Sequence, residues 1–200
     1  MAGVDRAWVG VALLWALGCS GGEVPADPAP EVVLPTISTR PEGTVEERLV
    51  KAKELAREGD RSKAIEVLEE ALLIDHKDRE TLALLARYGR EESRAVAETD
   101  PGRAYRLMVS AGGYLRELGA AYPDATDEEK ALQVDVLYDE ASAHARSKRV
   151  EETVGALRDA VAAGFRDFDR LRADKDWAEM LTIPQFQKPF EEITASAEKK

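Results

Sequence analysis

From residue 44 onward, apolar residues recur three or four positions apart, in runs that alternate with polar positions. That spacing indicates amphipathic helices. Turn-forming residues interrupt the runs at 59–60, 100–102 and 122–124, and two helices joined by a tight turn form a helical hairpin. The sequence therefore predicts an all-α domain over residues 44–200. Its hairpins are expected over about 44–75, 79–121 and 126–163.

Local signals mark where these helices begin and end. Thr44 and Thr126 are each followed three positions later by a glutamate, Glu47 and Glu129. This arrangement predicts a capping box, in which hydroxyl and carboxylate satisfy each other's free backbone N–H group at a helix start. Gly164 follows the last apolar run and is suited to end a helix. The first helix of the second hairpin is expected to be longer than that of the first.

The segment 52–75, AKELAREGDRSKAIEVLEEALLID, resembles a tetratricopeptide repeat. In that repeat small residues stand where its two helices approach closely, with larger apolar residues beside them. The positions that match are Ala52, Leu55, Ala64, Leu68 and Ala71. Arg48 and His76 depart from the pattern, because the family usually has an aromatic residue and a proline there. The resemblance implies a short α-solenoid of antiparallel helical hairpins that binds proteins.

Residues 160–186 resemble the closing element that follows many bacterial tetratricopeptide arrays. The matching positions are Gly164, Phe165, Leu171, Asp174, Leu181, Pro184 and Phe186. The last hairpin of a solenoid leaves an apolar face open, which a terminal cap has to cover. We therefore expect a C-terminal helical cap over 164–200. The side chains suited to cover the open face are Phe165, Phe168, Trp177, Leu181 and Phe186.

The N-terminal part differs in character from the rest. An uncharged apolar stretch runs from residue 7 to residue 18, too short to span a bilayer, and ends at Cys19, the chain's single cysteine. The string Ala16-Leu17-Gly18-Cys19 resembles a bacterial lipobox. The resemblance implies that signal peptide 1–18 is removed and that the Cys19 thiol is lipidated. The alternative is a plain signal peptide with an incidental cysteine.

The segment 19–43 contains five of the nine prolines. Because proline blocks helices and removes backbone donors, this segment is expected to be an extended tether. The chain is therefore expected to be exported and lipid-anchored to a bacterial cell membrane, on the periplasmic or outer-membrane face.

Charge and chemistry narrow the possible functions. The net charge of −11 argues against a nucleic-acid partner, because phosphate binding needs clustered Lys and Arg. Glu140 and His144 are four positions apart on one expected helix. A zinc site needs three or four such ligands, so a solvated pair or a helix salt bridge is expected instead. His76 is expected in an exposed turn. No catalytic, metal or cofactor motif is recognised, and the chain is expected not to be an enzyme.

In tetratricopeptide folds the first helix of each pair lines a concave groove. Applied to this sequence, the resemblance assigns to the groove Lys53, Arg57, Arg87, Arg90, Tyr138 and Arg146. A basic groove with Tyr138 as an aromatic anchor is suited to an acidic peptide or a C-terminal carboxylate. The competing explanation, which we favour, is that these cations pair with neighbouring glutamates and bind nothing.

These observations predict a scaffold or adaptor in the cell envelope that binds partner proteins or peptides through the groove. One alternative is an enzyme or accessory subunit that acts on envelope polymers, with an Asp/Glu pair in a helical cleft. Another is a module for self-association, which a large exposed apolar patch would indicate.

Overall fold

The computed structural model describes residues 43–197. The predicted signal peptide 1–18, the lipidation site Cys19 and all but the last residue of the predicted tether lie outside these residues. Within 43–197, no helix combines the length and the apolar character needed to cross a membrane.

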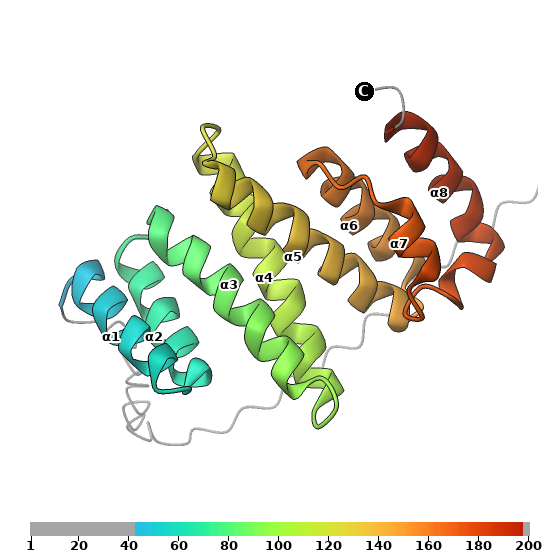
Figure 1. The fold of residues 1–200 in the computed structure, drawn as a ribbon. Helices are drawn as coiled ribbons and strands as arrows, with labels where there is room; N and C mark the ends of the chain where they lie inside the picture. Colours follow the sequence, from blue (N-terminus) through green and yellow to red (C-terminus); the bar gives the residue numbers. More distant parts are fainter. Residues whose placement is uncertain (1–42, 198–200) are drawn as a thin grey trace, which may run out of the picture. The chain divides into compact units, whose positions relative to one another are not determined.

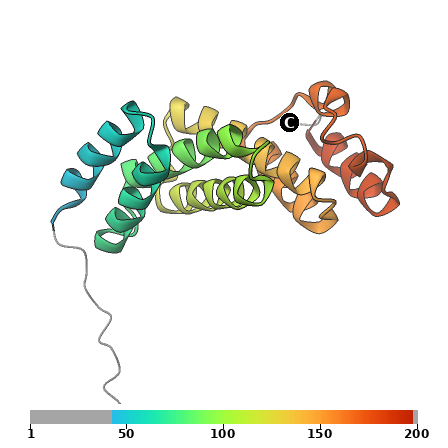
Figure 2. The same ribbon diagram turned by 90° about the horizontal axis from the view of Figure 1, so that it is seen from below.

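The described residues form an all-α domain of helices packed as sequential antiparallel pairs (Figures 1 and 2), which confirms the predicted fold class. The pairs are α1 with α2, α3 with α4, and α5 with α6. The bounds are α1 (Val45–Arg57), α2 (Arg61–Ile74), α3 (Arg79–Val96), α4 (Pro101–Ala121), α5 (Asp127–Arg146), α6 (Val150–Ala163), α7 (Phe168–Ala173), the 3-10 turn η1 (Met180–Thr182) and α8 (Pro184–Ala197).

The predicted helix starts are present as capping boxes. The Glu47 N–H donates to Thr44 Oγ1 at 3.2 Å, and the Thr44 N–H donates to Glu47 Oε2 at 3.0 Å. Thr126 and Glu129 form the same reciprocal pair at 3.2 and 2.7 Å. Gly164 ends α6 with a φ of 120°, a backbone conformation that favours glycine. These signals are local in sequence, which is why they could be recognised without the fold.

Successive pairs stack through α2 on α3 and through α4 on α5, and the first helices α3 and α5 also touch directly (Figure 1). Small residues allow close approach within the first pair, because Ala52, Ala64 and Ala71 are completely buried. The core consists of three apolar clusters. The first joins α1, α2 and α3, the second α3, α4 and α5, and the third runs from α5 to α8.

The third cluster contains the aromatic residues predicted for the cap. Phe165, Phe168, Trp177 and Phe186 are buried, and Leu181 is partly buried against them. The aromatic rings contact one another in pairs: Phe165 stacks on Tyr138 of α5 with 4.7 Å between the ring centroids, and the centroids of Trp177 and Phe186 are 6.0 Å apart. The C-terminal helices thus cover the apolar face of the α5–α6 pair. This packing fixes α7 and the following turn beside α5, which matters for the site described next.

Candidate binding groove between α3 and α5

Helices α3 and α5 each present a row of polar side chains along the side on which they meet. On α3 the row follows a helical spacing of three and four, which places its members on one face; they are Arg87, Arg90 and Arg94. On α5 the corresponding row is Asp135, Asp139, Ser142 and Arg146. We call the surface between these rows the α3–α5 groove. It contains an ion-pair bridge at its centre and a pocket at either end.

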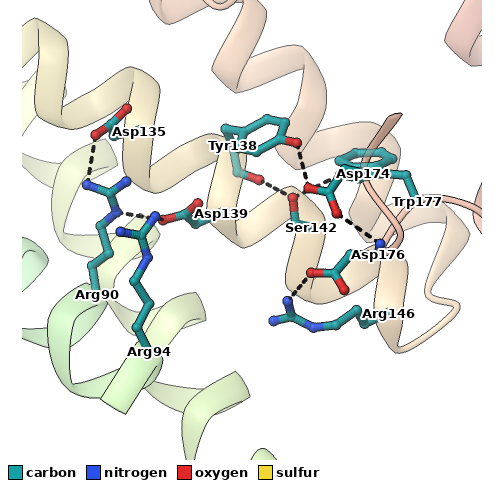
Figure 3. Close-up of polar contacts among 10 residues, drawn as sticks. All are labelled: Arg90, Arg94, Asp135, Tyr138, Asp139, Ser142, Arg146, Asp174, Asp176 and Trp177. Atoms are coloured by element: carbon teal, nitrogen blue, oxygen red, sulfur yellow. Dashed lines mark hydrogen bonds and ion pairs between the residues drawn. The ribbon is translucent and has the colours of Figure 1, made fainter. Parts of the chain in front are cut away.

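The bridge ties the two helices together. The Arg90 guanidinium bonds Asp135 at 2.8 Å and Asp139 at 2.5 Å, and Arg94 reaches the same Asp139 oxygen at 2.8 Å (Figure 3). Burial opposes the charge of Arg90, but the hydrogen bonds to Asp139 and Asp135 outweigh it, so the pKa of Arg90 is raised. Arg90 and Asp139 are 16% and 13% exposed, so this bridge forms part of the groove floor.

Toward the C-terminal ends of α3 and α5 lies a pocket of about 300 Å³, here called the arginine pocket. Three arginines from different elements line it: Arg94 of α3, Arg146 of α5 and Arg170 of α7. Arg94 and Arg146 are 55% and 48% exposed, and Arg170 is exposed as well. The remaining lining residues are Ser93, Ala97, Met108, Tyr138, Asp139, Ser142, Asp174 and Asp176.

The floor of the arginine pocket is a hydrogen-bonded layer (Figure 3). The Tyr138 hydroxyl donates to Asp174 at 2.9 Å. Ser142 Oγ accepts from the Trp177 indole N–H at 2.9 Å and donates to the Tyr138 carbonyl at 3.0 Å. Burial, together with the Asp174 carboxylate, raises the pKa of Tyr138 to about 12. Arg170 lies over the Tyr138 ring, 4.8 Å from its centroid. The floor groups are therefore engaged within the protein, and the guanidinium groups are the exposed ones.

Toward the N-terminal ends of the same two helices lies a second pocket, of about 360 Å³, here called the leucine pocket. Its apolar lining is Ala83, Leu84 and Leu132, each of which is partly exposed. Its polar lining is Arg79, Glu80, Arg87, Thr126, Glu128 and Glu129. Arg79 holds Glu129 through two hydrogen bonds of 2.7 Å. The hydrogen bond from Arg79 lowers the pKa of Glu129 to about 2.

The structure places the predicted groove residues in different situations. Arg90 forms the central bridge, and Arg146 lies at the arginine pocket, where it pairs with Asp176 at 2.5 Å. Arg87 is exposed at the leucine pocket. Arg57 is exposed and lines neither pocket. Lys53 of α1 forms an ion pair with Glu80 of α3 at 2.5 Å.

Tyr138 differs from its predicted role as an exposed anchor. It is 3% exposed, because its ring packs between Phe165 and Trp177. At the arginine pocket its hydroxyl bonds Asp174 and its ring lies under Arg170. Its contribution to the groove is therefore to the floor of the pocket.

The expected pairing of the basic residues with glutamates on the same helix is not what the structure contains. Lys53, Arg90 and Arg146 each pair with a carboxylate of another element. Among residues 43–197, Arg57 and Arg87 form no ion pair at all. Ion pairing therefore explains part of the basic row, and it joins α1 to α3, α3 to α5, and α5 to the segment after α7.

Sequence reasoning missed Arg94 and Arg170. Arg94 lies seven positions after Arg87 and four after Arg90, so extending the predicted row by one turn would have found it. Arg170, Asp174 and Asp176 carried no such signal. They belong to the cap, and they reach the pocket only because the aromatic cluster packs that segment against α5.

Of the two expectations for Glu140 and His144, the solvated pair is wrong, and the two side chains meet at the i,i+4 spacing of a helix salt bridge. Glu140 and His144 are 2% and 6% exposed, with 3.6 Å between the carboxylate and the imidazole. Arg116 of α4 binds both Glu140 oxygens at 2.8 and 3.2 Å, and the Tyr105 hydroxyl lies 3.1 Å from His144 Nδ1. In the described part of the chain, no three His, Cys, Asp or Glu side chains gather as metal ligands would. The pair belongs to a buried polar network that joins α4 to α5.

Comparisons of the chain with protein-family models, with curated proteins and with solved structures gave no match in any of the three. No family is thereby identified for it. A function must therefore be argued from the geometry of the α3–α5 groove.

Proposed function

We propose that this protein is an adaptor that binds a segment of a partner protein in the α3–α5 groove. The observation that carries the proposal is the convergence of Arg94, Arg146 and Arg170 on one pocket from three separate elements. Their guanidinium groups are exposed, whereas Asp139 and Asp176, which pair with two of them, are only 13% and 21% exposed. The third carboxylate, Asp174, is half-buried and accepts from the Tyr138 hydroxyl and the Asp176 N–H. The surface available to a ligand is thus richer in donors than in acceptors.

A guanidinium carries more N–H donors than a single ion pair uses. Arg94 and Arg146 each make one ion pair, and the Arg170 side chain lies over a ring. Donors therefore remain for carboxylates and backbone carbonyls, and Arg binds carboxylates through paired hydrogen bonds. A peptide supplies both kinds of acceptor. The position of the groove along two helices also suits an elongated ligand better than a compact one.

The proposal includes the family resemblance and the anchor inferred from the sequence. In a tetratricopeptide-type array the first helices of successive pairs line the binding groove, and α3 and α5 are such helices. The sequential antiparallel pairs are consistent with that family. Lipidation at Cys19 would hold the adaptor at a bacterial membrane, with residues 19–43 as the tether. The partner protein would then be retained near that membrane.

The test is selection of a random peptide library on the immobilised full chain and on two triple variants. The first variant is Arg94→Ala/Arg146→Ala/Arg170→Ala, which empties the arginine pocket of its cations. The matched control is Arg57→Ala/Arg106→Ala/Arg158→Ala, which removes the same charge from exposed arginines outside both pockets. Helicity and urea midpoint are measured first, so that only folded variants are compared.

We expect peptides to be enriched by the full chain and by the control, and not by the pocket variant. Enrichment that survives in the pocket variant would place binding on another surface. If the folded full chain enriches no peptide, the proposal of a peptide-binding adaptor is wrong. Mass spectrometry of proteins crosslinked to the chain in its native membrane then identifies the partner.

A further inference from the structure

The leucine pocket and the arginine pocket lie on one continuous face. From α3 and the residue that follows it, the lining residues of the two pockets are Arg79, Glu80, Ala83, Leu84, Arg87, Ser93, Arg94 and Ala97. On α5 they are Glu128, Glu129, Leu132, Tyr138, Asp139, Ser142 and Arg146. Between the two sets, Arg90 on α3 and Asp135 on α5 each lie three positions from the nearest lining residue on either side, and they bond each other. Residues three and four apart share a helix face. A single ligand can therefore contact both pockets across the Arg90 bridge.

The two pockets differ in polarity. Leu84 and Leu132 give the leucine pocket an apolar surface, and both are only partly buried. Covering that surface with an apolar side chain is favourable, at about 25 cal/mol for each Å² removed from water. The arginine pocket instead offers the N–H donors of Arg94, Arg146 and Arg170. Asp139, Asp174 and Asp176 also line this pocket, but they are engaged within the protein, and the exposed guanidinium groups can bind a carboxylate through paired hydrogen bonds.

The spacing between the pockets follows from the helices. Leu84 and Arg94 are ten positions apart on α3, and Leu132 and Ser142 are ten positions apart on α5. At about 1.5 Å per residue, either helix gives a separation of about 15 Å. An extended peptide advances about 3.3 Å per residue, so four or five residues cover that distance. A helical peptide would need about ten.

We propose that the groove binds an extended segment with two anchors, an apolar side chain and a carboxylate side chain four or five residues apart. This inference rests on the proposed function and specifies the partner sequence it would select. The residues between the anchors pass over the bridge formed by Arg90, Asp135 and Asp139. An extended peptide has backbone N–H and C=O groups free to hydrogen-bond with the charged groups of the bridge, whereas those of a helical peptide are hydrogen-bonded within the helix.

The experiment uses fluorescent peptides with one Leu and one Glu in a Gly/Ser host, separated by two to ten positions and made in both sequence orders. Binding to the full chain is measured by fluorescence anisotropy. We expect the tightest binding at a separation of four or five. Affinity there should be about tenfold higher than at two or eight, the loss expected when one charge-assisted hydrogen-bonded anchor is missing.

Two variants assign the anchors to their pockets. Arg94→Ala/Arg170→Ala should remove the advantage of the peptide's Glu and keep that of its Leu. Leu132→Ala should do the reverse. Arg158→Ala, an exposed arginine of α6 outside both pockets, should change neither.

Several results would overturn the inference. An optimum near ten would mean a helical ligand, and equal affinity at every separation would mean that no pair of anchors is recognised. If inorganic phosphate displaces all the peptides equally, and the Leu adds nothing to their affinity, the groove contains only a simple anion site. If none of these peptides binds while the library is still enriched through the arginine pocket, the two-anchor motif is wrong and the adaptor proposal stands. If the library also fails, both are wrong.

Discussion

Two neighbouring glycines of α4, Gly112 and Gly113, offer a sharp test of the buried polar network. A Cβ added at Gly112 would lie 2.0 Å from Glu140 Oε2 and 2.5 Å from Glu140 Cδ, whereas one added at Gly113 meets nothing within 4 Å. Arg116 and His144 hold the Glu140 carboxylate in place, and the residue is 2% exposed. The Glu140 carboxylate therefore occupies the space that a side chain at position 112 would need.

The two substitutions should change the free energy of unfolding in opposite directions. Replacing glycine by alanine within a helix gains about 0.5–1 kcal/mol, and Gly113→Ala should show that gain. Gly112→Ala should stabilise the helix by the same amount, but its methyl group displaces the Glu140 carboxylate from its two hydrogen bonds with Arg116. Disrupting a buried charge pair in this way costs about 3–5 kcal/mol. The net expectation is a loss of about 2–4 kcal/mol in the free energy of unfolding, and a urea midpoint about 1–2 M lower.

Urea unfolding followed by circular dichroism measures both variants, and a double-mutant cycle locates the cause. In a Glu140→Ala background the obstructing carboxylate is absent, and Arg116 keeps its bond to Asp159 at 2.8 Å. Gly112→Ala should then become stabilising, as Gly113→Ala is. Two results would refute the reasoning. One is a stabilising Gly112→Ala in the parent chain, and the other is an equal loss in both backgrounds.

Three further expectations concern stability. The hydrogen bond with Arg79 lowers the pKa of Glu129 from 4.5 to about 2. The ionised carboxylate therefore stabilises the fold fully above pH 4.5, and this stabilisation is lost as the pH falls toward 2. Glu129→Gln should make the urea midpoint less dependent on pH over that range. Ser142→Ala leaves the buried Trp177 indole N–H without its acceptor and should cost about 1–3 kcal/mol, measured by urea unfolding followed by fluorescence. Leu157→Ala, at a completely buried position of α6, should cost about 2–5 kcal/mol in the same assay.

Matched controls separate these effects from general damage. Glu128→Gln removes an exposed carboxylate next to Glu129 and should leave the pH profile unchanged; an equal flattening would contradict the role given to Glu129. Ser110→Ala, at an exposed serine of α4, should be nearly neutral; a cost equal to that of Ser142→Ala would show that the indole bond contributes nothing. Leu157→Met keeps the buried volume and should cost less than about 1.5 kcal/mol.

The sequence contained enough information for the helix pairs, because their signals lie within a few residues of each other. Thr44 with Glu47 and Thr126 with Glu129 mark helix starts whatever surrounds them. The burial of the cap aromatics could be predicted in the same way, from the open face of the last hairpin. Gly164 was recognisable as a helix end because the apolar run stops there.

The groove was less predictable, because its composition depends on packing between distant segments. The row on α3 follows a helix period, so Arg87 and Arg90 were found and Arg94 could have been. Tyr138 was placed on the correct helix, but its burial depends on the position of Phe165. Arg170 reaches the pocket only through the cap. The burial of Glu140 depends on the space left at Gly112 on the preceding helix, which no pattern around Glu140 indicates.

The division of the core into three clusters has a consequence for folding. Each cluster is built from helices close in the chain, so little loop entropy is lost before its contacts form, and folding should be fast for a domain of this size. Such arrays also open unevenly, with terminal units exchanging their amide protons before central ones. Opening of α1 and α2 would break the first cluster and would remove Leu72 from the edge of the second. Fraying of the N-terminal hairpin would free Glu80 from Lys53 and uncover one side of Leu84 at the leucine pocket, whereas the arginine pocket, built on the third cluster, would outlast it.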